Sequence, residues 1–139
     1  MGFWWDHTST SQATRTVEDI VAGINNRDFA ALEVLVADNV LFMDSTGGYV
    51  TGRQDGMLLL KRLLAYDPAF KIHLDNVTPH NSFVLAAGYT TGARQDTAER
   101  TLFKLLIEDG LLAEWRSYSA DAPKPIVQML MGARAPAKA

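Results

Sequence analysis

A single carboxylate at the end of an apolar stretch is the first group in this sequence that could do chemistry. The stretch Val40–Asp44 is apolar except for its last residue, and a glycine-rich turn follows it. We expect Asp44 to project into an apolar pocket. Desolvation there disfavours the charged form of a carboxyl group and suits it to accept a proton near neutral pH. The alternative is structural, because an aspartate at this position also caps a turn such as Ser45–Tyr49 through its side chain.

Four further side chains are candidates to act beside this carboxylate. Tyr49 in the loop and Ser117 on a later strand are candidate catalytic residues, and His73 and Tyr89 are candidates to contact a ligand. A histidine flanked by apolar residues in an alternating run is also typical of a strand surface. The three histidines have no spacing to carboxylates that predicts a metal site. We therefore expect neither a metal nor a cofactor.

The composition excludes several classes of function. A net charge of −3 does not fit the clustered Lys and Arg of a nucleic-acid-binding surface. Without cysteine, the chain has no disulfide, thiolate metal site or cysteine nucleophile. No segment approaches the roughly 18 apolar residues needed to span a bilayer, and the polar N-terminal segment lacks the apolar core of a signal peptide. We expect a soluble, cytoplasmic protein of one domain, the usual organisation at 139 residues.

Apolar residues at helical spacing predict three helices in the first half of the chain. The first begins at Thr16, within a capping-box pattern. The second follows the N-cap Asp28, and the third covers residues 54–66 until Asp67-Pro68 stops it. Residues 1–15 are expected to form an N-terminal arm, because three aromatic residues and a Ser/Thr run show no helical period.

From residue 69 onward, the period changes from helical to alternating. Four runs predict the strands of an antiparallel meander: 70–77, 83–93, 99–107 and 111–119. The connection Ile107–Gly110 suits a type I turn with glycine in the left-handed region. A meander of this length must curve to bury one face on the helices, which leaves a cavity at its open end. The fold class is therefore α+β.

The order of these elements resembles the NTF2-like superfamily, which includes SnoaL-like polyketide cyclases, ketosteroid isomerase and limonene-epoxide hydrolase. The resemblance covers residues 17–121 and rests on element order and local patterns. These patterns are Ala37-Asp38-Asn39-Val40, a strand ending in Asp44, Thr51-Gly52 before a helix, and Glu114-Trp115-Arg116-Ser117-Tyr118. It implies a cone-shaped α+β barrel in which three N-terminal helices pack on a curved antiparallel sheet.

The resemblance also implies the extent of the domain. The NTF2-like domain is expected at residues 16–121, between the arm and a C-terminal tail at 122–139. Within that tail, the apolar segment Ile126–Met131 is expected to dock on the domain.

The resemblance places Asp44 where ketosteroid isomerases carry their general-base aspartate. The two donors of that enzyme's oxyanion hole have no counterpart, because their positions match Ile20 and Phe103. Each lost donor costs on the order of a hundredfold or more in rate, so steroid isomerase activity is not expected. Epoxide hydrolase activity is not expected either, because Ser117 stands where that family carries an acid. We interpret the charges of Arg94-Gln95-Asp96 as solvated turn residues.

Strand alternation predicts the lining of the pocket. If Trp115 faces inward, Phe103, Leu105 and Ile107 on the paired strand do so too. The predicted ligand-contacting residues are Ile20, Ile24, Phe42, Leu60, Leu63, His73, Tyr89, Phe103, Leu105 and Trp115. The opposite face of the last strand is predicted to pack against a second copy in a homodimer, with Leu112, Glu114, Arg116 and Tyr118 outward.

Two functions from different classes remain open. One is an isomerase, cyclase or lyase of SnoaL-like type that acts on a small hydrophobic substrate, with Asp44 as general acid/base. The other is a binding or accessory domain that holds a hydrophobic ligand, or only dimerises, without catalysis. In both, the expected ligand is a small apolar molecule, and neither nucleic acid nor a membrane is an expected partner.

Overall fold

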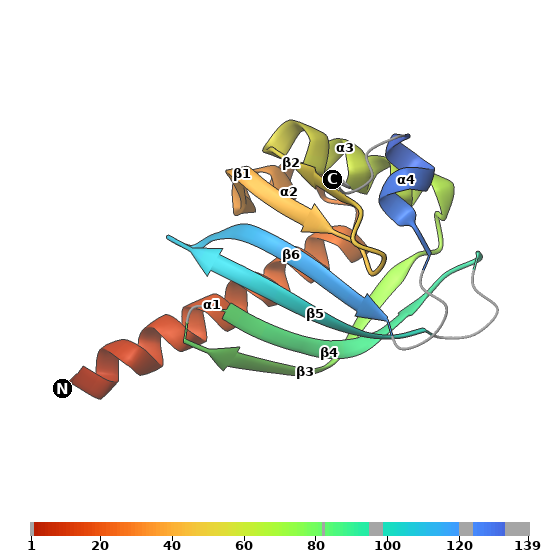
Figure 1. The fold of residues 1–139 in the computed structure, drawn as a ribbon. Helices are drawn as coiled ribbons and strands as arrows, with labels where there is room; N and C mark the ends of the chain where they lie inside the picture. Colours follow the sequence, from red (N-terminus) through yellow and green to blue (C-terminus); the bar gives the residue numbers. More distant parts are fainter. Residues whose placement is uncertain (1, 82, 95–98, 120–123, 133–139) are drawn as a thin grey trace.

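The computed structural model describes residues 2–81, 83–94, 99–119 and 124–132, with side chains from residue 12 onward. Helices and strands occur in the order α1 Gly2–Asn25, α2 Phe29–Leu35, β1 Val36–Met43, β2 Tyr49–Thr51, α3 Arg53–Tyr66, β3 Lys71–His80, β4 Phe83–Thr91, β5 Glu99–Glu108, β6 Leu111–Ser119 and α4 Ile126–Met131. Figure 1 shows the helices gathered against one face of a curved sheet, with α3 and α4 as neighbours. The α+β class predicted from the sequence is confirmed.

Six strands form the sheet in the order β2-β1-β6-β5-β4-β3. The predicted meander β3-β4-β5-β6 is confirmed, with antiparallel pairing throughout. One pair departs from this antiparallel pattern, because β1 runs parallel to β6. Parallel neighbours need a long crossover, and here the connection runs through β2, α3, β3, β4 and β5. The pairing sets Phe42 beside Trp115 in the centre of the sheet.

The first helix is longer than the sequence predicts. It runs without a break from Gly2, so the residues expected as an arm are helical, and its N-terminal end extends past the sheet in Figure 1. Thr16 is not a cap: its hydroxyl donates to the carbonyl of Gln12 one turn earlier. The predicted apolar face is confirmed, because Val17, Ile20, Val21 and Ile24 are all buried. Docking of the aromatic side chains at positions 3–5 lies outside the side chains described.

Two polar side chains join the end of α1 to the start of β3. The side-chain amide of Asn25 pairs with the backbone of Ile72 as a neighbouring strand would. Its Nδ2 donates to the Ile72 carbonyl at 2.8 Å, and its Oδ1 accepts from the Ile72 N–H at 2.9 Å. The Arg27 guanidinium donates to the carbonyls of Phe70 and Pro68 at 2.8 and 2.7 Å. These bonds seat β3, the edge strand of the curved sheet, against α1.

The remaining helices begin and end largely as predicted. Asp28 accepts a hydrogen bond from the Ala31 amide as the N-cap of α2, and α3 ends at Tyr66, before Asp67. The apolar tail segment docks as α4: the Val127 side chain is fully buried, and Arg62 of α3 donates to the α4 backbone. The expected start of the tail falls in residues 120–123, outside the described ranges. None of the described helices has the length and apolar character to cross a membrane.

The hairpin between β5 and β6 departs from the predicted register. Asp109 and Gly110 both have positive φ, 53° and 77°. This is typical of a type I′ turn rather than type I. A bulge follows, in which Ile107 pairs with Leu112 while Leu106 pairs with Glu114. The extra residue turns Leu112 inward, where it is fully buried, so the prediction that it faces outward is wrong.

A second bulge bends the sheet between β3 and β4. The register shifts between Leu74 and Asn76, opposite Gly88. The two backbones approach so closely there that a Cβ atom on Gly88 would lie 1.9 Å from the carbonyl oxygen of His73. Glycine is the residue that permits such an approach. The bend carries Ile72 and Thr90 to the wall of the cavity described next.

Candidate functional site

The helices and the inner face of the sheet enclose a cavity of about 160 Å³. Its walls come from distant parts of the chain. Six of the predicted ligand-contacting residues line it: Ile24, Phe42, Leu60, Leu63, Phe103 and Trp115. The Phe103 and Trp115 rings meet edge to face at 5.1 Å between centroids, with Phe42 on the other side of Trp115 at 6.3 Å. The three aromatic rings form a wall and leave the chamber open.

Four of the predicted ligand-contacting residues lie elsewhere. Ile20 and Leu105 are fully buried in the core and do not reach the cavity. Alternate residues of β4 are buried, from Val84 to Thr90, so Tyr89 faces outward, and its cross-strand partner His73 faces outward with it. Their rings stack at 4.7 Å between centroids. This pair belongs to the sheet surface, because side chains alternate between the faces of a strand.

Of the three candidate catalytic residues, two line the cavity and one does not. Asp44 and Ser117 line the cavity, and Tyr49 on β2 does not. The indole nitrogen of Trp115 donates to the Ser117 hydroxyl oxygen at 3.0 Å. Ser119, two residues further along β6, also lines the cavity and lies 3.1 Å from the Ser45 hydroxyl. The chamber is thus mainly apolar, and the Asp44 carboxylate and these serine hydroxyls are among its polar lining groups.

The Asp44 carboxylate accepts four hydrogen bonds from the protein. Oδ1 accepts from the amide and hydroxyl of Thr46 at 2.9 and 2.7 Å, and from the Gly48 amide at 3.0 Å. Oδ2 accepts from the Val127 amide in the first turn of α4, at 2.8 Å. A carboxylate offers about four acceptor positions. Asp44 thus caps its turn, as in the structural alternative, and also ties the C-terminal helix to the cavity wall.

Sequence reasoning missed part of the cavity wall, including the contribution of α4. Further apolar lining residues are Met43, Leu59, Phe70, Ile72, Ile126 and Val127. The apolar character of the tail indicated that it docks, without indicating where. Asp67, interpreted only as a helix stop, is 3% exposed and accepts from the Ala93 and Arg94 amides at 2.9 and 3.2 Å.

The exposed lining residues mark where the cavity meets solvent. They are Tyr66, Arg94 and Lys124. The Arg94 guanidinium lies 4.6 Å from the centroid of the Tyr66 ring, and Lys124 donates to the Arg94 carbonyl at 3.1 Å. Arg94 is exposed, as predicted for a turn charge, while Asp96 falls outside the described ranges. Within those ranges, no three His, Asp or Glu side chains gather as metal ligands would.

Comparison with solved structures gives this arrangement a context. An epoxide hydrolase from M. tuberculosis, similar to limonene-epoxide hydrolase, superimposes with a TM-score of 0.70 and 18% identity over 80% of this chain and 84% of that one. A protein classified as a ketosteroid isomerase from Kribbella flavida superimposes with a TM-score of 0.70 and 19% identity, over 84% of this chain and 83% of that one. A protein classified as a SnoaL-like polyketide cyclase from Jannaschia sp. CCS1 superimposes with a TM-score of 0.73 and 16% identity, over 89% of this chain and 94% of that one.

The chain has the NTF2-like fold. No family model matches the sequence, and no curated protein sequence matches it either. With identities below 20%, the NTF2-like similarity concerns the fold alone. Within this NTF2-like fold, Asp44 joins the turn after β1 to the first turn of α4.

Proposed function

We propose that the protein binds a small apolar molecule in the cavity between α1, α3, α4 and the sheet. The observation that carries this proposal is an apolar cavity of about 160 Å³ walled by Phe42, Phe103 and Trp115. An engineered apolar cavity of about 150 Å³ stays dry and binds benzene. A substituted benzene ring is therefore an appropriate size for the enclosed part of a ligand. Larger ligands would extend past Tyr66 into solvent.

The Leu63→Trp variant tests this proposal. Leu63 lines the cavity, so an indole ring at this position fills the space a ligand would take. We expect α-methylstyrene, a neutral aromatic probe, to bind the wild-type protein saturably and the variant at least tenfold more weakly. The free energy of unfolding should change by less than about 1.5 kcal/mol, because the added ring enters existing space. Binding is measured by NMR titration of the methyl resonances of cavity residues.

The matched control is Leu58→Trp on the same helix. Leu58 is 36% exposed and does not line the cavity, so this variant should bind the probe as the wild-type protein does. Equal affinity of the Leu63→Trp variant and the wild-type protein would contradict the proposed site. Absence of saturable binding to the wild-type protein would contradict the function itself.

A second candidate function is acid–base catalysis in the same cavity. It is favoured by one observation: Asp44 lines the cavity, and its Oδ2 accepts only one described hydrogen bond, from the Val127 amide. The reaction class is that of an isomerase, cyclase or lyase acting on a small hydrophobic substrate. Asp44 would accept a proton through the remaining acceptor position of Oδ2. An Asp44→Asn variant that keeps its fold should lose turnover completely, and full activity in that variant would rule out this candidate.

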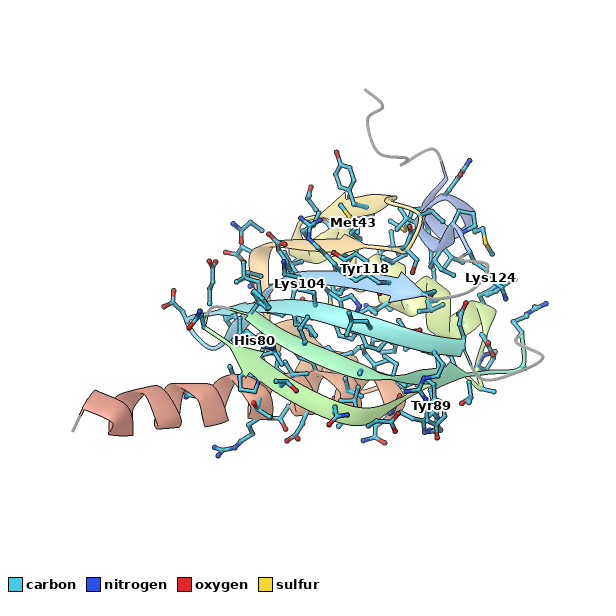
Figure 2. All side chains as sticks on the ribbon, turned by 60° about the horizontal axis from the view of Figure 1, so that its bottom comes forward. Met43, His80, Tyr89, Lys104, Tyr118 and Lys124 are labelled. Atoms are coloured by element: carbon cyan, nitrogen blue, oxygen red, sulfur yellow. The ribbon has the colours of Figure 1, made fainter. Side chains whose placement is uncertain are left out.

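We also propose a homodimer formed through the outer face of the sheet. Tyr118 and its cross-strand partner Leu102 are 48% and 39% exposed there. Tyr118 and Lys104 are labelled on these adjacent strands in Figure 2. Nearby, a hydrogen bond to Glu114 at 3.0 Å raises the pKa of the Arg116 guanidinium, so this cation is satisfied within its own subunit. The apolar residues are then the part of this face that gains most by burial.

Light scattering at micromolar concentration tests the dimer. We expect twice the chain mass of 15.3 kDa for the wild-type protein. A Tyr118→Arg variant should have the mass of one chain, because two added cations would face each other across the two-fold axis. Val34→Arg is the control: Val34 lies on α2 and is 72% exposed. A wild-type mass of one chain would contradict the proposal.

A further inference from the structure

The serine and threonine hydroxyl groups along the cavity differ in whether they already donate a hydrogen bond within the protein. The Thr101 hydroxyl donates to the carbonyl of Glu99 at 3.2 Å. The Ser45 and Ser119 hydroxyls share one bond, so one proton of that pair is used. Ser117 is different. Its oxygen accepts from the Trp115 indole, which can only donate, and among the described residues nothing accepts the Ser117 proton.

The indole also fixes where that proton can go. The bond from Trp115 Nε1 at 3.0 Å occupies one lone pair of the serine oxygen. Trp115 itself is 7% exposed and packed against Phe103, so the donor cannot rotate away. The O–H group of Ser117 is therefore a hydrogen-bond donor in a fixed position at the wall of the cavity. When the serine oxygen accepts a hydrogen bond, the O–H group is polarised. The hydrogen bond that the same O–H group donates is then stronger.

We propose that Ser117 is a specificity-determining hydrogen-bond donor, and that the ligand is an apolar molecule carrying one carbonyl oxygen. This inference rests on the proposed binding function. A carbonyl oxygen only accepts hydrogen bonds, so it complements the O–H donor of Ser117. The remaining proton of the Ser45–Ser119 pair lies on the same side of the chamber, because Ser117 and Ser119 share one face of β6. It can supply a second donor to the same oxygen.

Two probes of matched shape separate this role from general packing. Acetophenone and α-methylstyrene differ in that a carbonyl oxygen replaces a methylene group. We expect Ser117→Ala to weaken acetophenone binding about fivefold, the effect of one lost hydrogen bond. Binding of α-methylstyrene should stay within about twofold, since it makes no hydrogen bond. Ser117→Thr keeps the hydroxyl and should restore acetophenone binding.

The infrared carbonyl band of bound acetophenone gives an independent readout. It should lie at lower frequency in the wild-type protein and in Ser117→Thr than in Ser117→Ala, because a donated hydrogen bond weakens the C=O bond. Equal weakening of both probes by Ser117→Ala, or no weakening of either, would overturn the role of Ser117 while the binding function stands. Failure of the wild-type protein to bind either probe would overturn both.

Discussion

The Asp44→Ala variant is expected to lose about 3 kcal/mol of unfolding free energy. Two of the four donors that it abandons, the Gly48 and Val127 amides, are partly buried, and each costs on the order of 1–3 kcal/mol when left without an acceptor. The two donors on Thr46 are exposed and can turn to water instead. Urea unfolding followed by circular dichroism measures the difference.

The matched control is Asp38→Ala on β1, the strand that directly precedes Asp44. The Asp38 side chain is 87% exposed, and its only described bond is an ion pair with Arg53 at 2.6 Å. Exposed ion pairs contribute roughly 0–1 kcal/mol, so this variant should remain within about 1 kcal/mol of the wild-type protein. Equal losses in the two variants would contradict the capping role of Asp44.

The Asp44→Asn variant should show which part of the structure depends on the carboxylate. Its side-chain oxygen can still accept from Thr46 and Gly48, but its amide group then faces the Val127 amide, donor against donor. We expect a loss of about 1.5 kcal/mol, concentrated in α4 and visible as faster hydrogen exchange of the Val127 amide. Loss of turnover in this variant therefore supports acid–base catalysis only when α4 remains docked. The Val127 exchange rate must be measured beside activity.

The Gly88→Ala variant is expected to lose about 3 kcal/mol, a cost typical of severe overpacking. The new methyl group would meet the backbone of β3, at 1.9 Å from the His73 carbonyl oxygen and 3.0 Å from Leu74 Cα. Backbone atoms in a paired strand cannot move aside as a flexible side chain can. The two strands must separate, and Ile72 and Thr90 move with them at the cavity wall.

A control for Gly88→Ala lies at the next residue. Ala87→Gly changes the same two residue types in the opposite direction, at a partly exposed position. Its cost should be about 1 kcal/mol or less, from the greater freedom of glycine in the unfolded chain. Urea unfolding of both variants makes the comparison. A loss below 1 kcal/mol in Gly88→Ala would show that the strands are not held in contact at the bulge.

Most of the fold could be predicted from local sequence patterns. Period 3.6 in Val17–Ile24 and period 2 from residue 70 onward report which face of each element is buried, because burial follows the geometry of one element at a time. Phe103, Trp115, Leu60 and Leu63 reach the cavity as predicted for the same reason. The predictions failed where one residue changes the register. The bulge at Ala113, directly after Leu112, places the Leu112 side chain in the core instead of on the outer face.

The sequence by itself determined that Asp44 follows an apolar segment, and it predicted a strand end and an apolar chamber there. The strand β1 in fact ends one residue earlier, at Met43. The sequence left open whether the carboxylate serves a turn or a reaction, since both uses need the same residue at the same place. Tertiary structure decided how that carboxylate is occupied, by bringing the Val127 amide, 83 residues along the chain, within 2.8 Å of it. Hydrogen bonds between distant segments leave no local periodicity. The role of Asp44 as the link between its turn and α4, and the unused proton of Ser117, therefore became visible only in the folded chain.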